Sequence, residues 1–358
     1  MAKFDECFLH IGTEKTGTST LQEFFYQNKL NLAKNDIFFP ETFGKKNHIK
    51  LSAYACSDNK KDDVRKTLGL INLTLIKDFR HEIDTSFQQE IENQNCRKLL
   101  LSGGHLQSRL TSVEEIQFLK NFLDNFTFRY KVVIYLRSQL DMGISNYSTF
   151  CKTGGTTKRI LPGGIPRRIL PGTDETDLYF NHEELLDRWS QVFGSENLII
   201  KIYDRAELLE GDIKKDFISV LGLNWNNFKD VENFNESLNA DAQRFLLEIN
   251  QFLPSFIGDK PNKDYKNMVE LVSHNRKGKG LLPSREQAEN FVKIFDDSNE
   301  RVRQKWFPER KKLFEVDFSI YPEKQFSDTD YSFAFKIFAE VWSKKHNPST
   351  SKRVRLSN

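Results

Sequence analysis

Cysteine is scarce in this chain: its 358 residues include four, Cys7, Cys56, Cys96 and Cys151, far apart from one another. They show neither the close spacing of metal ligands nor the density of a disulfide framework. We therefore expect no metal site, and a reducing, cytoplasmic compartment.

Long apolar runs are also missing, because no segment approaches the roughly 18 to 20 residues needed to span a bilayer. The opening residues, MAKFDECFLHIG, hold two acids where a signal peptide needs a basic end and an apolar stretch. We expect neither a membrane span nor secretion by that route. The composition likewise excludes collagen, a coiled coil and a disulfide miniprotein.

Net charge is nearly absent: 53 Lys and Arg against 50 Asp and Glu give +3, which argues against a general nucleic-acid binder. This balance hides a segregation. Residues 151–173, 273–285 and 343–358 carry +5, +4 and +5, so the rest of the chain carries −11. What is abundant is phenylalanine, with 31 residues, so much of the core must be aromatic.

Short apolar segments alternate with helical patterns along the first two hundred residues. Strands are expected at 8–11, 99–102, 131–137 and 197–204, and helices lie between them. This order predicts an α/β fold with a central parallel sheet flanked by helices, a P-loop-like three-layer architecture. Residues 60–95 read as an amphipathic helix whose expected buried face is Leu68, Ile71, Leu75, Ile76 and Phe79.

We expect one α/β domain over residues 1–343. Two parts of it depart from the alternating pattern: a basic Gly/Pro-rich loop at 151–173, and a mostly helical stretch from about 240 to 343. Residues 344–358 form a polar, basic tail that we expect to be disordered.

The first strand is followed by the turn GTEKTGTST and then by a helical pattern. Gly12 and Gly17 keep the G-x-x-x-x-G spacing of a P-loop, in which main-chain N–H groups and a helix N-terminus hold an anion. An ATP-binding P-loop has its lysine directly after the second glycine. Here Thr18 and Ser19 follow Gly17, and Lys15 precedes it. A solvated turn is the alternative interpretation.

HIGTEKTGTSTLQ resembles the 5′-phosphosulfate loop of sulfotransferases that use 3′-phosphoadenosine 5′-phosphosulfate (PAPS), closest to the K-T-G-T-[TS] form of carbohydrate and bacterial members. The resemblance implies that Lys15 contacts the bridging oxygen of the phosphosulfate. The donor-binding residues that it implies in this turn are Thr13, Lys15, Thr16, Gly17, Thr18, Ser19 and Thr20.

A second motif matches the family's 3′-phosphate site, an Arg at the end of a central strand and a Ser eight residues later. KVVIYLRSQLDMGIS supplies Arg137 and Ser145 at that spacing, and a guanidinium with a hydroxyl suits a phosphate dianion. Weaker matches are Tyr203, expected near the adenine, and the R-K-G stretch Arg276, Lys277 and Gly278. The alternative for Arg137 is a surface strand end, that for Tyr203 is a core position, and that for the R-K-G stretch is a basic surface loop.

The candidate general base is His105 in LLLSGGHLQ, since an imidazole is a suitable base near neutral pH. Bacterial members often have Glu directly before this His, but here Gly104 stands there; the two preceding glycines are expected to let a substrate approach. Helix capping is the alternative role for His105. His10 and Glu14 are further candidates to line the acceptor site. The alternative for His10 is a position in the core, and that for Glu14 is an ion pair with Lys15.

The loop at 151–173 is the expected acceptor lid, and its basic residues suit an anionic or polyhydroxylated acceptor such as a glycan. Candidate contacts are Lys158, Arg159, Arg167 and Arg168; a merely solvated loop is the alternative. The sequence thus predicts a metal-independent sulfotransferase. It would move the sulfuryl group from PAPS to a hydroxyl on a carbohydrate or other small acceptor and release adenosine 3′,5′-bisphosphate. The rivals are an ATP-dependent P-loop kinase and a non-catalytic anion- or glycan-binding module.

Overall fold

A computed structural model describes residues 3–60, 62–161, 177–232, 237–258, 260–274, 276, 278–325 and 337–338. They pack as two compact units. Unit 1 takes its described residues from Met1–Gln139, Gly163–Asn235 and Ile294–Glu315, and unit 2 from Leu140–Pro162, Glu236–Lys293 and Val316–Asn358. The expected single domain over 1–343 stays a prediction, and the basic tail at 344–358 lies outside the described residues.

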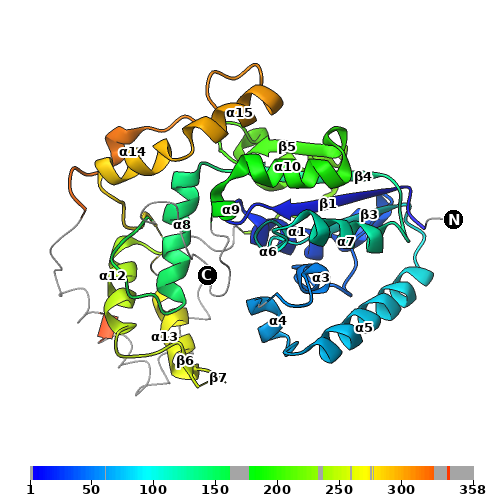
Figure 1. Ribbon diagram of the computed structural model, residues 1–358, viewed down its shortest axis with the longest axis horizontal. Helices are drawn as coiled ribbons and strands as arrows, with labels where there is room; N and C mark the ends of the chain where they lie inside the picture. The colour runs from blue at the N-terminus through cyan, green and yellow to red at the C-terminus, as the bar shows by residue number, and fades with distance from the viewer. Residues whose placement is uncertain are drawn as a thin grey trace. The chain divides into compact units, whose positions relative to one another are not determined.

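Unit 1 is built on a five-stranded parallel sheet with the strand order β2-β3-β1-β4-β5 (Figure 1). The four expected strands are present, and a two-residue edge strand joins them. The strands are β1 (Glu6–Gly12), β2 (Ile37–Phe38), β3 (Lys98–Ser102), β4 (Tyr130–Leu136) and β5 (Leu198–Ile202). The predicted α/β fold with a central parallel sheet is confirmed.

Helices cover both faces of this sheet, because β1 and β4 carry apolar side chains on both sides. One core layer includes Phe43, Phe87 and Trp189, and the other includes Phe24 and Phe217, as the phenylalanine content predicted. The helices of the first layer are α3 (Lys50–Ala55), α5 (Leu73–Glu92), α7 (Val113–Leu123), α10 (His182–Phe193) and α15 (Asp296–Trp306). Those of the second are α1 (Thr18–Gln27), α2 (Lys29–Lys34) and α11 (Ile213–Val220). Short helices α6 (Leu106–Arg109) and α9 (Asp177–Phe180) and 3-10 turns at Ser195–Asn197, Leu209–Gly211 and Trp225–Asn227 complete the unit.

The single helix expected over 60–95 is wrong. Two helices, α4 (Asp63–Thr67) and α5, are separated at Gly69, whose φ of +75° ends the first helix, and the Asn72 side chain caps the second. Leu68 and Ile71 therefore lie between the two helices. Ile76 and Phe79 are buried as expected, but Leu68, Ile71 and Leu75 are exposed at 36%, 78% and 40%.

The regular structure of unit 2 consists mainly of helices; the expected mostly helical part from about 240 to 343 stays a prediction. The helices of unit 2 are α8 (Gln139–Lys152), α12 (Ala240–Ile249), α13 (Lys263–His274) and α14 (Arg285–Lys293), with a hairpin of β6 (Phe256–Ile257) and β7 (Lys260–Pro261) and a 3-10 turn at Phe318–Ile320. Within the part of the chain that the structure describes, no helix is both long and apolar enough to cross a membrane.

Candidate functional site

The turn between β1 and α1 bends twice into the left-handed region of φ and ψ. Lys15 has φ +67°, and Gly17, the N-cap of α1, has φ +74° and ψ 15°. Left-handed residues beside right-handed ones turn successive main-chain N–H groups toward one concave side, which suits an anion. The first N–H groups of α1, for which a helix supplies no internal acceptor, add to the same field, and the first turn contains no acidic residue.

Two threonines of this turn use their hydroxyls internally. Thr13 donates its Oγ1 hydrogen to the Tyr135 carbonyl at 3.0 Å, and Thr16 donates to the Thr13 carbonyl at 2.5 Å; both threonines are fully buried. The Thr16 hydroxyl thus closes the turn, and the expected part of Thr16 in donor binding stays a prediction. Thr18 and Ser19 are partly exposed on the first turn of α1, and Thr20 is buried.

Arg137 follows β4, and its guanidinium reaches the turn between β1 and α1. We call this turn, residues 12–17, the phosphate turn after its expected ligand. Its Nη1 donates to the Lys15 carbonyl at 2.6 Å. His182, at the start of α10, donates its Nε2 hydrogen to the Arg137 carbonyl at 2.8 Å and so holds the main chain of this residue. Burial lowers the pKa of His182 to about 4, so the ring is a neutral donor. The sequence motifs had no signal for His182.

Tyr203 lies directly after β5, and its ring covers the same turn. The guanidinium carbon of Arg137 is 5.5 Å from the centre of this ring. A Cβ at Gly17 would be 3.2 Å from the Tyr203 hydroxyl oxygen and 3.3 Å from Cε2. Gly17 is therefore required both by its φ and by the close approach of Tyr203.

Glu14 is bound by side chains that follow β3 and by α9. Its carboxylate accepts hydrogen bonds from the Ser108 hydroxyl and, at 3.2 Å, from the Tyr179 hydroxyl, while its main-chain N–H donates to Gln107 Oε1 at 3.4 Å. These contacts tie the phosphate turn to α6, the helix that begins directly after His105; the His105 side chain makes no capping hydrogen bond to it.

The turn that carries His105 packs against the phosphate turn. A Cβ at Gly104 would lie 3.3 Å from Thr18 Oγ1, and one at Gly12 would lie 3.3 Å from the Gly104 carbonyl oxygen. A Cβ at Gly103 would meet Leu106 Cγ at 3.0 Å. The two glycines thus admit neighbouring protein atoms, which corrects the expectation that they leave room for a substrate. They bring the segment that carries His105, whose ring is partly exposed, against the turn between β1 and α1.

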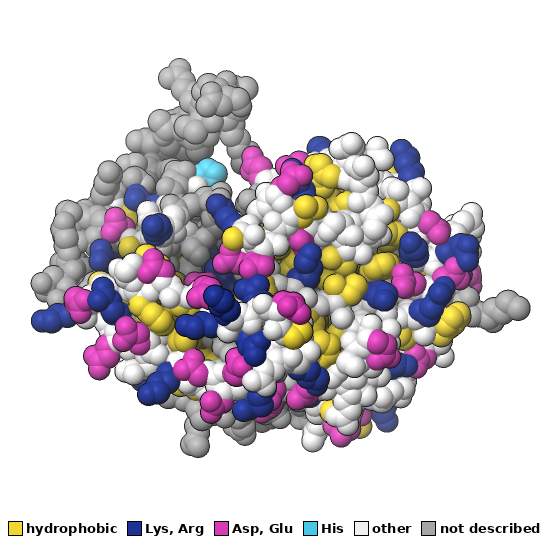
Figure 2. Space-filling view, turned by 90° about the horizontal axis from the view of Figure 1, so that it is seen from above, with side chains coloured by type: hydrophobic (Ala, Val, Ile, Leu, Met, Phe, Trp, Pro, Cys, Tyr) yellow, Lys and Arg dark blue, Asp and Glu magenta, His cyan; other side chains and the backbone are white. Residues whose placement is uncertain are grey.

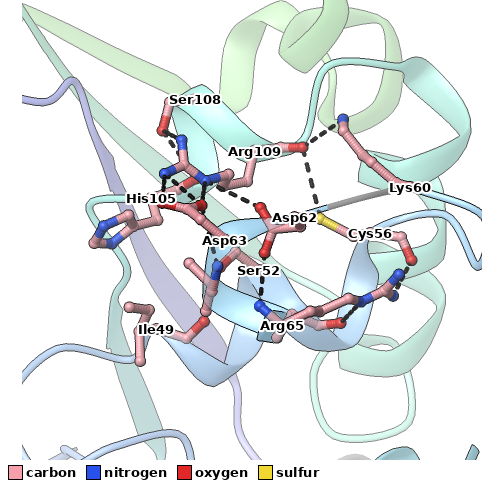
Figure 3. A network of polar contacts seen from close by, with 12 residues as sticks. Ile49, Ser52, Cys56, Lys60, Asp62, Asp63, Arg65, His105, Ser108 and Arg109 are labelled. Carbon is pink, nitrogen blue, oxygen red and sulfur yellow. Dashed lines mark hydrogen bonds and ion pairs between the residues drawn. The ribbon is translucent and has the colours of Figure 1, made fainter. Parts of the chain in front are cut away.

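A buried ion-pair network anchors α6 on the far side of His105 (Figure 3). The Arg109 guanidinium is 3.1 Å from the Asp62 carboxylate and 2.8 Å from that of Asp63 at the start of α4, and it also donates to Ser108 Oγ at 3.2 Å. In Figure 3 the His105 ring points away from these carboxylates. The network fixes the position of α6, and the His105 ring takes no part in these ion pairs.

His10 lies in the core of unit 1 and not at its surface. Its ring is fully buried, packs edge-on against Tyr135 and Phe217, and has Nδ1 2.9 Å from Ser102 Oγ. Burial lowers its pKa to about 3, so the ring is neutral. Of the two roles considered for His10, this position favours the core.

The remaining candidates belong to unit 2 or lie outside the described residues. Ser145 is partly exposed on α8, Arg159 is exposed, and Lys158 pairs with Glu248 at 3.1 Å. The main chain of Arg276 and Gly278 bonds to residues 237–239, just before α12. Lys277, Arg167 and Arg168 fall outside the described residues.

The first part of the expected lid is packed within unit 2. Residues 151 and 152 end α8, the Asn250 side chain donates to the Gly155 carbonyl at 2.7 Å, and Ile160 is buried. Two of the basic side chains in the predicted positive segments face acids, Lys158 with Glu248 and Arg285 with Glu323. Figure 2 accordingly shows positive and negative side chains intermingled over the face that it draws.

No family model matches the chain. Over 152 residues, 41% of its length, it is 25% identical to an uncharacterized protein of Archaeoglobus fulgidus, and the match spans 41% of that relative. A crystal structure of a sulfotransferase from Alicyclobacillus acidocaldarius resembles it with a TM-score of 0.45 and 14% identity, over 86% of this chain and 99% of the other. Similarity at this level carries no argument about activity, so the function is argued from the residues of the chain itself.

Proposed function

We propose that this protein is a sulfotransferase that moves the sulfuryl group from PAPS to an acceptor hydroxyl, with a carbohydrate as the expected acceptor. One observation carries the proposal: the Arg137 guanidinium is 2.6 Å from the Lys15 carbonyl. The two residues belong to motifs recognised separately in the sequence, one for a 5′-phosphosulfate and one for a 3′-phosphate. Their meeting at one turn is what a ligand with both groups requires.

In this proposal the phosphate turn binds the 5′ end of the donor. Its left-handed residues and the N-terminus of α1 supply N–H donors and a positive field. Lys15 stands within the turn, where its ammonium would neutralise charge on the leaving phosphate oxygen as the bond to sulfur breaks. Sulfuryl transfer, like phosphoryl transfer, depends mainly on alignment and charge stabilisation of this kind.

Arg137 is proposed to bind the 3′-phosphate, and Tyr203 to cover the nucleotide side of the turn. Ser145, a residue of unit 2, stays a predicted phosphate contact on its sequence motif alone. The guanidinium keeps donors beyond the one that it spends on Lys15, since it has five N–H groups. His182 holds the main chain of Arg137, and the Tyr203 ring lies next to the guanidinium. A phosphate would therefore bind to a guanidinium whose orientation is already set.

His105 is proposed to contact the acceptor hydroxyl, because its turn packs against Thr18 and brings the ring beside the donor site. Which ring nitrogen carries the hydrogen decides whether His105 accepts a proton or donates a hydrogen bond. The acceptor contacts of Lys158, Arg159, Arg167 and Arg168 remain part of the proposal, and charge reversal of Arg167 and Arg168 tests them through the acceptor KM.

The rival kinase is disfavoured by the position of Lys15. In an ATP-binding P-loop the lysine extends from the start of the helix toward the terminal phosphates, and here Thr18 occupies that place. Calorimetric titration with adenosine 3′,5′-bisphosphate and, separately, with ATP and Mg²⁺ discriminates. We expect binding of the bisphosphate alone; a preference for ATP with Mg²⁺ contradicts the proposal.

Catalysis is tested with 35S-labelled PAPS and a panel of sugars, with adenosine 3′,5′-bisphosphate monitored as product. Transfer to at least one sugar together with stoichiometric bisphosphate is the expected result. Tight bisphosphate binding without transfer to any hydroxyl acceptor would instead favour the non-catalytic binding module.

A further inference from the structure

Ser102, the last residue of β3, is held by buried groups on two sides. The main-chain N–H of His48 donates to its carbonyl at 2.9 Å, and its own N–H donates to His48 Nδ1 at 3.0 Å. His48 donates its Nε2 hydrogen to the Pro40 carbonyl at 2.9 Å. Asn47 is therefore fixed beside the end of β3, and a Cβ at Gly44 would lie only 2.3 Å from the Asn47 carbonyl oxygen.

The side-chain amides of Gln22 and Asn47 form a chain of hydrogen bonds between Ser102 and His105. Gln22 on α1 is 4% exposed, and its Nε2 is 3.3 Å from the Ser102 carbonyl oxygen and 3.2 Å from Asn47 Oδ1. The other end of the Asn47 amide, Nδ2, is 3.4 Å from His105 Nδ1. Both amides belong to unit 1, as does His105.

The directions of these hydrogen bonds follow from Ser102. A main-chain carbonyl only accepts, so the Gln22 atom that faces it must be the NH₂ group. This NH₂ group also faces Asn47, whose near atom must then be the carbonyl oxygen. Turning Gln22 over would set two acceptors together, and turning Asn47 over would set two donors together.

The Asn47 NH₂ group therefore faces the imidazole, and Nδ1 must be the acceptor. We propose that Gln22 and Asn47 are positioning residues that keep the hydrogen of neutral His105 on Nε2, so that the ring offers a hydrogen-bond donor to the acceptor side and not a free base. The tautomer stands on this geometry alone, and its role in catalysis rests on the proposed function.

This assignment revises the base expected from the sequence. With its hydrogen on Nε2, neutral His105 donates to a sulfuryl oxygen and stabilises the negative charge of the group in transfer. As the new bond between the acceptor oxygen and sulfur forms, the bond from sulfur to the 5′-phosphate oxygen breaks, and the hydroxyl proton passes to that leaving oxygen or to water. The Nε2–H bond of His105 stays intact in this role. To act as a base through Nε2, the ring would need its hydrogen on Nδ1, against the Asn47 NH₂ group.

The tautomer is measured without any activity, by long-range 1H–15N correlation on histidine-labelled full-length protein at about pH 9, where histidine is ordinarily neutral. His105→Gln assigns the His105 signals. We expect a pyridine-type Nδ1 and a pyrrole-type Nε2. Asn47→Asp, whose carboxylate only accepts, should move the hydrogen to Nδ1, whereas Asn121→Asp on the exposed part of α7 should not. A pyrrole-type Nδ1 in the unaltered protein overturns the inference.

The catalytic role is tested by comparing the kcat of two variants in which an amide replaces the imidazole, His105→Gln and His105→Asn. The Gln NH₂ group reaches about as far as Nε2, and the Asn NH₂ group only about as far as Nδ1, because Asn has one methylene less. We expect His105→Gln to keep a kcat at least about tenfold higher than His105→Asn, since one such donor contributes about 10²–10³ in rate. Equal losses in both variants overturn the donor role. If even the unaltered protein transfers no sulfate, the proposed function fails, and the spectrum still decides the tautomer.

Discussion

Arg137 and Lys15 are 122 residues apart in the chain, and the guanidinium of the first donates to the main-chain carbonyl of the second at 2.6 Å. The bond joins the residue after β4 to a turn residue with a left-handed backbone, φ +67°. It therefore supplies the carbonyl of the turn with a charged donor and brings a positive charge next to the turn.

The affinity for a 3′-phosphate should depend on Arg137. We expect Arg137→Ala to weaken binding of adenosine 3′,5′-bisphosphate by about 10- to 100-fold, because charge-assisted hydrogen bonds contribute about 1.5–3 kcal/mol. Binding of adenosine 5′-phosphate, which lacks the 3′ group, should weaken less. Isothermal titration with both nucleotides gives the two ratios, and equal losses would contradict a 3′-phosphate contact.

Turnover should depend on Lys15. Lys15→Ala is expected to lower kcat by about 10²–10³ through lost stabilisation of the leaving oxygen, with the thermal midpoint little changed. Lys34→Ala, at an exposed position of α2, removes the same charge as a matched control. Unchanged sulfate transfer by Lys15→Ala would exclude the leaving-group role.

The contact between Gly104 and Thr18 should couple the two turns. Gly104→Ala places a methyl group 3.3 Å from Thr18 Oγ1, and overpacking of this kind costs about 1 kcal/mol or more. We expect Gly104→Ala to weaken the binding of adenosine 3′,5′-bisphosphate. When Gly104→Ala is added to the Thr18→Ala variant, which lacks the hydroxyl, the loss of affinity should be smaller. A double-mutant cycle by calorimetry measures this coupling; strict additivity would show that the turns are independent.

Three buried histidines should make the protein sensitive to acid. Burial lowers the pKa of His10 and His48 to about 3 and that of His182 to about 4, against about 6.5 in an unfolded chain. Below about pH 6.5 the unfolded chain then binds more protons than the folded one. The stability that the neutral rings contribute is complete above that pH and is lost as the pH falls toward 4, by up to about 4 kcal/mol per pH unit for three groups.

Urea unfolding between about pH 7 and pH 4.5 checks this slope. His48 accepts from the Ser102 N–H and donates to the Pro40 carbonyl, and a Gln amide supplies both functions. His48→Gln should therefore fold and should reduce the slope by about a third. A slope that matches that of the unaltered protein would contradict the assignment to the buried rings.

The strand segments at 8–11, 99–102, 131–137 and 197–204 were predictable because buried parallel strands are continuous apolar runs. The turn and Arg137 were visible because glycine spacing and a strand-end arginine are local patterns. The break between α4 and α5 was missed, since a single glycine, Gly69, interrupts an otherwise helical pattern without a proline or a run of turn residues. The two-residue strand β2 is too short to show a period.

By itself, then, the sequence determined the α/β architecture, the G-x-x-x-x-G turn with its displaced Lys15, and the presence of His105 after β3. Only the tertiary structure decided that Arg137 meets the Lys15 carbonyl, that Ser108 and Tyr179 hold Glu14, and that Gln22 and Asn47 face His105. Apolar periodicity and glycine spacing act over a few residues. The hydrogen-bond partners of these groups come from segments up to 165 residues away, which the parallel strands bring to one edge of the sheet.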